Sequence, residues 1–432
     1  MKYIFLILLV LLPMVILGQS TESLTLADAV SIALKNNYGI NIQSTNLAIS
    51  RKNNSWGTVG ALPTISLSGS KSNTWNYSDD DDVTIDKLSG TVNFNWVLFR
   101  GFGARIDKSK LNEVEKLTEG NLAVVVENTL SNVIQAYYGV LLQSESMKIA
   151  EKLMLLSEDR YKMEDMKTSM GASVTYNLLQ AKNSFLEDKS NFLAARLAFN
   201  NSVRQLNFLM AAPLEKQYDF TAEFKADTTE FSLEDLTQQM LANNRTLRNQ
   251  YINLELSKLE VKAARSDFSP TVSLSGSGGY SKSETEYAVN SILNSSSSGY
   301  NASASLGVSF DLFTGGQKRR ALQIAKLEQD IAEIEITEIQ QELKNQLAQE
   351  FERYNVRKEM LVLADENLKA AELNLEISRQ KYETGAINSF NYRDINLIYF
   401  NAALMHRNAI YDLIESYHVL LRLTGGLLQE YQ

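Results

Sequence analysis

LPTISLSGS at residues 62–70 and SPTVSLSGS at residues 269–277 are two copies of one stretch, separated by 207 residues. At a later point LFRG at 98–101 recurs as LFTG at 312–315, and Gly171-Ala172 recurs as Gly385-Ala386, now 214 residues apart. The seven-residue change in offset falls between the two strands predicted in each copy, where a loop tolerates insertion. A repeat of this length is a duplicated domain and not a solenoid.

Each copy is predicted to begin with a helix, at about 25–58 in the first copy and 232–267 in the second. The apolar positions with helical spacing in the first copy are Leu26, Ala29, Val30, Ala33 and Leu34. Ser232 followed by Asp235 resembles a capping box. A first strand is then predicted from Pro63 and from Pro270, because proline is tolerated at the first residue of a strand.

A second strand in each copy alternates apolar with small polar residues, which is the two-residue period of strand geometry. The apolar positions are Val92, Phe94, Trp96 and Leu98 in the first copy, and Ala302, Ala304, Leu306, Val308, Phe310 and Leu312 in the second. Polar loops, Ser70 to Leu88 and Ser277 to Tyr300, are predicted to join the strands, with Ser295 to Ser298 as a flexible outer segment.

These strands would be about ten to twelve residues long, close to the length that a tilted membrane-spanning strand needs. A half-buried sheet in a soluble domain would show the same alternation. Five aromatic residues gather where strand meets helix and favour a membrane interface over that alternative: Trp96, Phe99, Phe102, Phe310 and Phe313.

Long helices are predicted from about Ala104 to Lys167 and over 318–383, because neither stretch contains proline. Each would be roughly 90–100 Å long at 1.5 Å per residue. A coiled-coil seam with unbroken 3-4 spacing is formed by Leu361, Ala364, Leu368, Ala371, Leu375, Ser378 and Tyr382. In the first copy, Asp188 and Ser202 interrupt the seam of the returning helix.

Gly171 and Gly385 are predicted to turn the chain between an outgoing and a returning helix, since glycine commonly follows the end of a helix. Thr175 and Ser389, four residues further on, are predicted to cap the returning helices. These two turns would be the far tips of the molecule, about 100 Å from the strands.

The N-terminus predicts export. Lys2 precedes an almost purely apolar run from Ile4 to Ile16, and the sequence Leu17-Gly18-Gln19-Ser20 suits a cleavage site, so residues 1–18 are predicted to be a signal peptide. An N-terminal anchor helix is the alternative. The absence of cysteine excludes a lipid-anchored form, disulfides and thiolate chemistry. The mature chain would divide into repeats at 19–222 and 223–432.

Other features limit the functional class. The net charge of −9 argues against a nucleic-acid partner. No His, Asp or Glu cluster has metal-ligand spacing, and no phosphate-binding loop or nucleophile elbow is found, so neither a cofactor nor an enzymatic activity is expected. The only histidines are His406 and His418, and His406 is expected to pack on a helix seam.

The acidic run from Asp79 to Asp82 suits either a cation site or, more simply, a solvated loop. A secreted coiled-coil adhesin would explain the long helices but not the two matched sets of strands.

The order of these duplicated features resembles the TolC-type outer-membrane efflux protein family over nearly the whole mature chain. The resemblance implies a mainly α fold with β structure, a long helical coiled-coil barrel joined to a transmembrane β-barrel. It implies a homotrimer, in which four strands from each protomer close one barrel and leave no edge exposed to lipid. It also implies an outer-membrane exit duct with a periplasmic extension, whose tips at Gly171 and Gly385 meet a periplasmic adaptor and an inner-membrane pump.

In that family, acidic residues shortly after the second tip glycine close the tunnel, often as Asp-x-x-Asp. The corresponding residues here are Asn391-Tyr392-Arg393-Asp394, so only the second acid is kept. A three-fold ring of Asp394 could select cations, whereas an Arg393–Asp394 pair between protomers could latch the tip. Both residues could also be simply solvated. Asn391, Arg393 and Asp394 are therefore the candidate periplasmic gate.

Overall fold

The computed structural model describes residues 22–430, and the predicted signal peptide at 1–18 lies outside them. The first half contains the elements β1 (Glu22–Leu24), α1 (Leu26–Asn36), α2 (Tyr38–Asn53), β2 (Thr64–Asn76), β3 (Val83–Arg100), α3 (Gly103–Ser169), α4 (Thr175–Leu209) and β4 (Tyr218–Phe220). The second half contains α5 (Leu233–Asn243), α6 (Arg245–Ser266), β5 (Thr271–Tyr287), η1 (Ser291–Leu293), β6 (Ser295–Ser309), α7 (Gln317–Glu383), α8 (Ser389–Thr424) and α9 (Leu427–Glu430).

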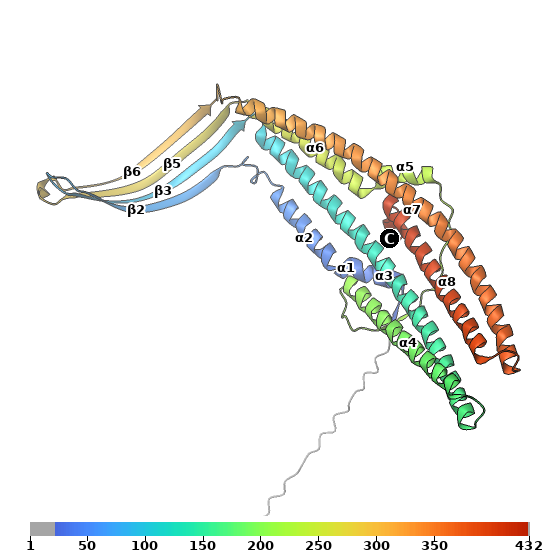
Figure 1. Cartoon of the computed structure of the whole chain (residues 1–432). Coiled ribbons are helices and arrows are strands. Elements are labelled where there is room, and N and C mark those ends of the chain that lie inside the picture. The colour runs from blue at the N-terminus through green and yellow to red at the C-terminus, as the bar shows by residue number, and fades with distance from the viewer. Residues whose placement is uncertain (1–21, 431–432) are drawn as a thin grey trace, which may run out of the picture.

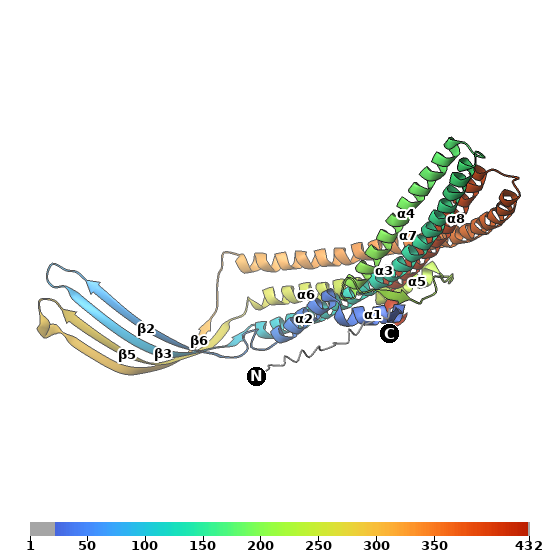
Figure 2. The ribbon, with the colours of Figure 1, turned by 90° about the horizontal axis from the view of Figure 1, so that it is seen from below.

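The molecule is elongated, with a sheet at one end and two helical hairpins at the other (Figure 1). The sheet is antiparallel and has the order β2-β3-β5-β6, so each copy contributes one hairpin. The helical layer continues from it, with α3 in contact with α2 and α6, and α6 in contact with α7. The α3–α4 and α7–α8 hairpins then extend together to the far end (Figure 2), where α3 also contacts α8.

The strands are longer than the alternation predicted. They contain 13, 18, 17 and 15 residues, and the predicted loops shrink to the short connections 77–82 and 288–294. The flexible segment predicted at Ser295 to Ser298 is the start of β6. These predictions were wrong because serine and threonine favour loops in isolation, whereas here cross-strand pairing holds them extended.

The two hairpins share a register at their base, because Thr64 pairs with Asn95 and Thr271 pairs with Ser309. The seven extra residues of the second copy therefore lie at its far end, as the change in repeat offset predicted. Part of this insertion extends the strands themselves, since cross-strand pairing continues to Asn76 in the first hairpin and to Thr285 in the second.

The single helix predicted at the start of each copy is broken in two, at Asn37 and at Asn244. Each asparagine has an extended ψ, 131° and 121°, and its side-chain oxygen caps the helix that follows. Each amide also donates to the end of the returning helix, Asn37 to the Leu209 carbonyl at 2.8 Å and Asn244 to that of Leu423 at 3.0 Å. The repeated Asn-Asn pair therefore marks a bend.

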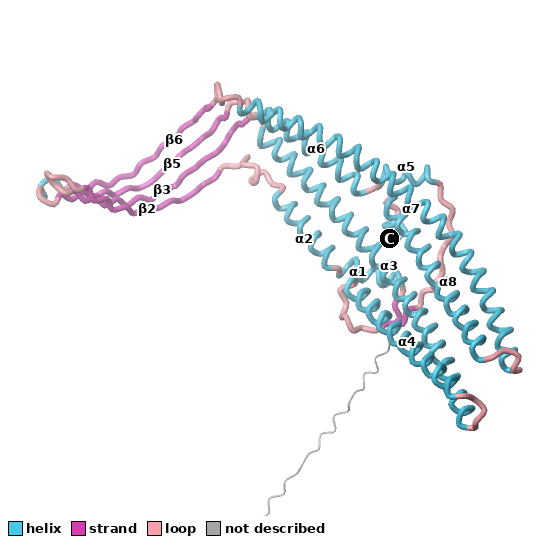
Figure 3. The backbone as a smooth tube through the Cα atoms, viewed as in Figure 1, coloured by secondary structure: helices cyan, strands magenta, loops and turns pink. Residues whose placement is uncertain are grey.

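The long helices agree closely with the prediction (Figure 3), since α3 and α7 each contain 67 residues. At 1.5 Å per residue, each is about 100 Å long. Within residues 22–430, no helix is both long enough and apolar enough to cross a membrane.

A hydrophobic cluster in each copy fixes the middle of the helical layer. The first joins α1, α3 and α4 around the fully buried Tyr137, whose hydroxyl donates to the Leu24 carbonyl at 2.8 Å. The second joins α5, α7 and α8 around Tyr354, whose hydroxyl donates to the Thr229 carbonyl at 2.7 Å. Burial raises the pKa of each phenol to about 12, so both remain donors in this environment.

Candidate functional site

One face of the sheet is apolar from its base to a pair of tyrosines. Successive rows of paired residues on this face are Trp96, Leu274 and Leu306; then Ile65, Phe94, Gly276 and Ala304; then Leu67, Val92, Gly278 and Ala302; then Gly69, Gly90, Tyr280 and Tyr300. The Tyr280 and Tyr300 rings lie 5.1 Å apart. From Val272 to Tyr280 the band measures about 26 Å along the strand, or about 20 Å across a membrane at a tilt of about 40°.

The opposite face is lined by hydroxyl and amide groups. Its rows are Thr64, Asn95, Ser275 and Ser305; then Ser66, Asn93, Ser277 and Ser303; then Ser68, Thr91, Gly279 and Asn301; then Ser70, Ser89, Ser281 and Gly299. Hydroxyl pairs bridge neighbouring strands at 2.7–2.9 Å, for example Ser275 with Ser305 and Ser277 with Ser303. Between Arg100 at the base and Lys87 near the outer end, these rows are uncharged. Such a face suits the wall of a water-filled pore. It would discriminate only weakly between solutes of different charge.

The five predicted interface aromatics lie at the junction of sheet and helices. A β-bulge between Val97 and Phe99 places Phe99, instead of Leu98, opposite Val272 on the apolar face. The Phe99 and Phe102 rings meet edge to face at 5.3 Å, and the Trp96 indole donates to the Ala61 carbonyl at 3.0 Å. Phe310 and Phe313 follow the end of β6, and both are exposed.

The acidic run at the outer end has a structural role that the sequence did not indicate. The Asp81 carboxylate accepts hydrogen bonds from the backbone amides of Val289 and Asn290 at 2.8 and 3.0 Å, and so ties the first hairpin loop to the second. Asp82 accepts from the amide of Ser78. Within residues 22–430, no group of three or more His, Cys, Asp or Glu side chains is arranged to hold a metal ion.

The two tip glycines turn the chain as predicted. Gly171 and Gly385 have φ values of +73° and +77°, and the residue after each donates back to the helix, to Lys167 and Lys381, at 2.8 Å. A Cβ at either glycine would meet open space, so the backbone conformation, and not crowding, requires glycine.

The predicted caps of the returning helices are displaced by one residue. Thr175 and Ser389 are the first helical residues, and the N-caps are Val174 and Asn388. The Asn388 side chain accepts hydrogen bonds from the amides of Phe390 and Asn391, whereas Val174 makes no side-chain cap. The second tip is therefore the better capped of the two.

Behind the second tip, Arg393 of α8 forms a two-pronged ion pair with Asp188 of α4. Its two terminal nitrogens lie 2.7 and 3.2 Å from the two carboxylate oxygens. The Asp188 side chain is 2% exposed and that of Arg393 is 14% exposed, so the pair is nearly dry. This explains why a carboxylate interrupts the apolar seam of α4. It also occupies Arg393, which therefore does not share the exposed face of Asn391 and Asp394.

Arg160 of α3 makes a second tie between the hairpins. Its Nε donates to the Ser389 hydroxyl at 2.8 Å, and its guanidinium carbon lies 5.2 Å from the centre of the Phe390 ring. Burial, followed by the nearby charge of Arg393, lowers the pKa of Arg160. A cavity of about 270 Å³ beside these ties is bordered by both arginines and by the stacked rings of Tyr382 and Tyr392.

Sequence reasoning missed most of this tip cluster. Asp188 was visible as a charge within an apolar seam, which is a signal that a buried partner exists. Nothing in the local pattern singled out Arg160 or the buried Glu164, which accepts from the Ser173 hydroxyl at 2.9 Å and steadies the first tip loop.

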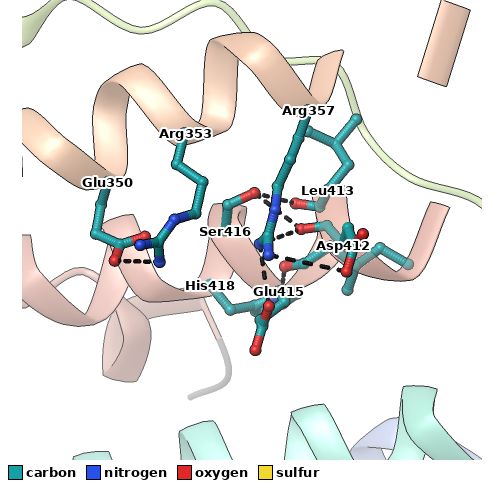
Figure 4. A network of polar contacts seen from close by, with 9 residues as sticks. Glu350, Arg353, Arg357, Asp412, Leu413, Glu415, Ser416 and His418 are labelled. Atoms are coloured by element: carbon teal, nitrogen blue, oxygen red, sulfur yellow. Dashed lines mark hydrogen bonds and ion pairs between the residues drawn. The ribbon is translucent and has the colours of Figure 1, made fainter. Parts of the chain in front are cut away.

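Nearer the middle of the helices, a polar network joins α7 to α8 (Figure 4). Arg357 donates to the Asp412 carbonyl at 2.7 Å and to the Glu415 carboxylate at 3.0 Å. Nearby, His418 is buried and its Nδ1 donates to the Ile414 carbonyl at 2.7 Å. Burial lowers the pKa of His418. His406, expected to pack on a seam, is mostly buried with its Nε2 3.8 Å from the Asp365 carboxylate.

Two strand hairpins in one sheet, with one apolar and one hydroxyl-lined face, and two helical hairpins whose outgoing helices are about 100 Å long define an outer-membrane channel fold. The sequence model described as "Outer membrane efflux protein" matches residues 29–212 and 236–426, one stretch in each copy. The chain therefore belongs to the outer membrane efflux protein family. Its family and fold are those of channels and not of enzymes.

Curated relatives extend over almost the whole chain. The alkaline protease secretion protein AprF of Pseudomonas aeruginosa is 19% identical over 440 residues, which cover 96% of this chain and 87% of AprF. The outer membrane efflux protein BepC of Brucella suis is 21% identical over 419 residues, which cover 96% of this chain and 88% of BepC.

Solved structures show the same fold. The CmeC outer membrane channel of Campylobacter jejuni superposes with a TM-score of 0.77 at 18% identity, covering 93% of this chain and 85% of CmeC. The open MtrE outer membrane channel of Neisseria gonorrhoeae gives 0.71 at 17% identity, covering 93% of this chain and 89% of MtrE. The predicted family and fold class are thus confirmed.

Proposed function

We propose that three copies of this chain close into one continuous duct. This duct carries substrates delivered by an inner-membrane pump across the periplasm and the outer membrane, as part of a tripartite efflux or type I secretion system. The names of the two curated relatives, one a secretion protein and the other an efflux protein, fit the two versions of this role. The sheet would form the outer-membrane segment, and the helices would extend into the periplasm.

The main support for this proposal is the two open edges of the sheet in each protomer. Within residues 22–430, the sheet ends at β2 on one side and at β6 on the other, and each edge strand is paired along one side only. Unpaired strand edges are not tolerated in lipid, so they must pair with other copies. Because the edges differ, β6 of one copy would meet β2 of the next, and a head-to-tail contact of this kind closes into a ring.

The helical layer is open on the same two sides, at α2 and at α7 (Figure 1). On α7 an apolar stripe with 3-4 spacing is 54–67% exposed, formed by Ile324, Leu327, Ile331 and Ile334. On α2, Tyr38, Ile42 and Ile49 are exposed in the same way. Contact between these stripes in neighbouring copies would bury them and continue the ring below the membrane.

The two faces of the sheet set its orientation. The apolar face, with the aromatics Trp96, Phe99, Phe102, Phe310 and Phe313 at its base, would meet lipid at the periplasmic interface. The hydroxyl-lined face would line the pore. The tip turns at Gly171 and Gly385 would then lie deepest in the periplasm, where an adaptor protein can reach them.

Asp394 is our candidate for the periplasmic gate, with Asn391 beside it. Both are exposed at positions i and i+3 of α8, so three copies could present a ring of carboxylates and amides. Arg393 would act differently, since its bond to Asp188 holds two hairpins of one copy together. We expect Asp394→Ala to raise single-channel conductance and to abolish block by divalent cations, with Gln180→Ala, at the equivalent position of the first copy, as the control.

Planar-bilayer recording of the detergent-extracted oligomer tests the proposal as a whole. A duct predicts a stable oligomer that forms discrete conducting channels. A chain that washes from membranes without detergent, or an extracted oligomer that never conducts, would refute the proposed function. Unchanged conductance and cation block in Asp394→Ala would refute only the gate.

A further inference from the structure

Just beyond the two tyrosines on the apolar face, the sheet carries a row of basic side chains. Lys71 of β2 pairs directly with Leu88 of β3, and Leu88 pairs with Lys282 of β5. Direct cross-strand partners lie on the same face of a sheet, so both lysines continue the face that bears Tyr280. Both lysines therefore lie on this face, in the polar segments that lengthen the strands beyond their predicted limit.

The height of this row matches the level of lipid phosphates. Lys282 lies two residues beyond Tyr280, about 7 Å along the strand and about 5 Å along the membrane normal at a tilt of about 40°. The polar zone of a bilayer adds about 5–7 Å on each side of the hydrocarbon. With the tyrosine rings at the hydrocarbon boundary, the lysine amines would reach the phosphate layer.

The charges on the row favour an anionic occupant. In residues 22–430, Lys71 has no acidic side chain within ion-pair distance, whereas Lys282 is 2.5 Å from Glu284 in the next row. On the opposite face, one residue further out along the strands, Lys87 lies between Ser72 and Ser283. Lys87 faces the pore side and provides an internal control, since it differs from Lys71 in face and by only one row in height.

We propose that Lys71 and Lys282 form a phosphate-contact belt on the outside of the barrel, which binds anionic lipid headgroups of the outer leaflet and sets the depth of the sheet. This inference rests on the membrane orientation given under the proposed function. In a closed trimer, the belt would present six lysines around the circumference. The occupant is a membrane lipid and not free phosphate, because the row directly continues a surface that must already be covered by acyl chains.

The test is native mass spectrometry of the detergent-extracted oligomer, titrated with phosphatidylglycerol or with phosphatidylcholine. A lysine near an anionic surface contributes about 1 kcal/mol, a fivefold change in affinity. Lys71→Gln should weaken binding of phosphatidylglycerol about fivefold, and Lys71→Gln/Lys282→Gln should weaken it further. Neither variant should change binding of phosphatidylcholine, and Lys87→Gln should bind both lipids like the unaltered protein.

Further outcomes separate the possible failures. Equal binding of phosphatidylglycerol by the double variant and the unaltered protein overturns the belt, and so does an equal loss in Lys87→Gln. Loss of binding on adding EDTA would assign the lipid to cation bridges from Glu284 and its cross-strand partner Asp86, which form the next row of the same face. That result also overturns the belt. Competition by millimolar inorganic phosphate would overturn the lipid as occupant. Conductance of each oligomer is recorded in parallel, because an unaltered oligomer that conducts but does not bind phosphatidylglycerol refutes the belt alone, whereas one that never conducts refutes the proposed function.

Discussion

Replacing Arg393 with alanine should loosen the far ends of α4 and α8 by about 3–5 kcal/mol. The reason is the burial of its partner. The Asp188 side chain is 2% exposed and receives both of its short ion-pair contacts from the Arg393 guanidinium. Without Arg393, a carboxylate remains in a nearly dry site with no opposite charge. Asp188→Ala should cost a similar amount, because it leaves a guanidinium that is mostly buried.

The duplicated chain provides a design for removing both charges together. At the repeat offset of 214 residues, Arg393 corresponds to Leu179 and Asp188 corresponds to Ala402. The equivalent positions therefore hold leucine in the first copy and alanine in the second. Arg393→Leu/Asp188→Ala should cost far less than the sum of the two single changes, since replacing a whole buried pair with apolar residues is often neutral or stabilising.

The assay is amide hydrogen exchange of the intact oligomer, read on peptides from α4 and α8. A local loss of 3 kcal/mol speeds exchange by a factor of more than a hundred, because 1.4 kcal/mol is a factor of ten. Arg379→Ala is the control, since Arg379 pairs with Glu383 at 3.1 Å where both side chains are more than 60% exposed. The reasoning would be refuted if the single variants exchanged as slowly as this control. It would also be refuted if the effect of the double variant equalled the sum of the effects of the two single variants.

Three further predictions follow from the helices and the outer loops. Asn244→Ala should lower the free energy of unfolding by about 1–2 kcal/mol, because it removes a helix cap and leaves a buried carbonyl without its donor; a loss below about 0.3 kcal/mol in urea titrations would contradict this. Because burial lowers the pKa of His418, folding favours its neutral form. Its contribution to the free energy of unfolding is therefore present above pH 6.5 and declines as the pH falls below that value. His418→Phe should flatten the pH dependence of the urea midpoint, and an unchanged slope would argue against this account. Asp81→Ala should free the second outer loop, so that amides in 288–294 exchange faster while the tips do not change, whereas protection equal to that of the unaltered protein would show that the two hydrogen bonds do not hold the loop.

Much of the fold could be predicted because the decisive signals are local and occur twice. The absence of proline permitted α3 and α7, and a glycine with positive φ ends each tip. Alternation over β3 and β6 placed the strands, although it could not set their length. Serine and threonine favour loops in isolation and strands when paired, so the ends of the hairpins depended on neighbours that the pattern does not show.

The sequence by itself determined the duplication, the order of the elements, the tip turns and the class of channel, since each depends on residues a few positions apart or on the repeat. Only the tertiary structure decided which side chains meet. Arg393 and Asp188 are 205 residues apart, and packing of both α4 and α8 against α3 brings them together. The bend at each repeated asparagine also required a carbonyl from a distant helix. Buried polar groups need partners, and only the packed chain shows which partners lie within reach.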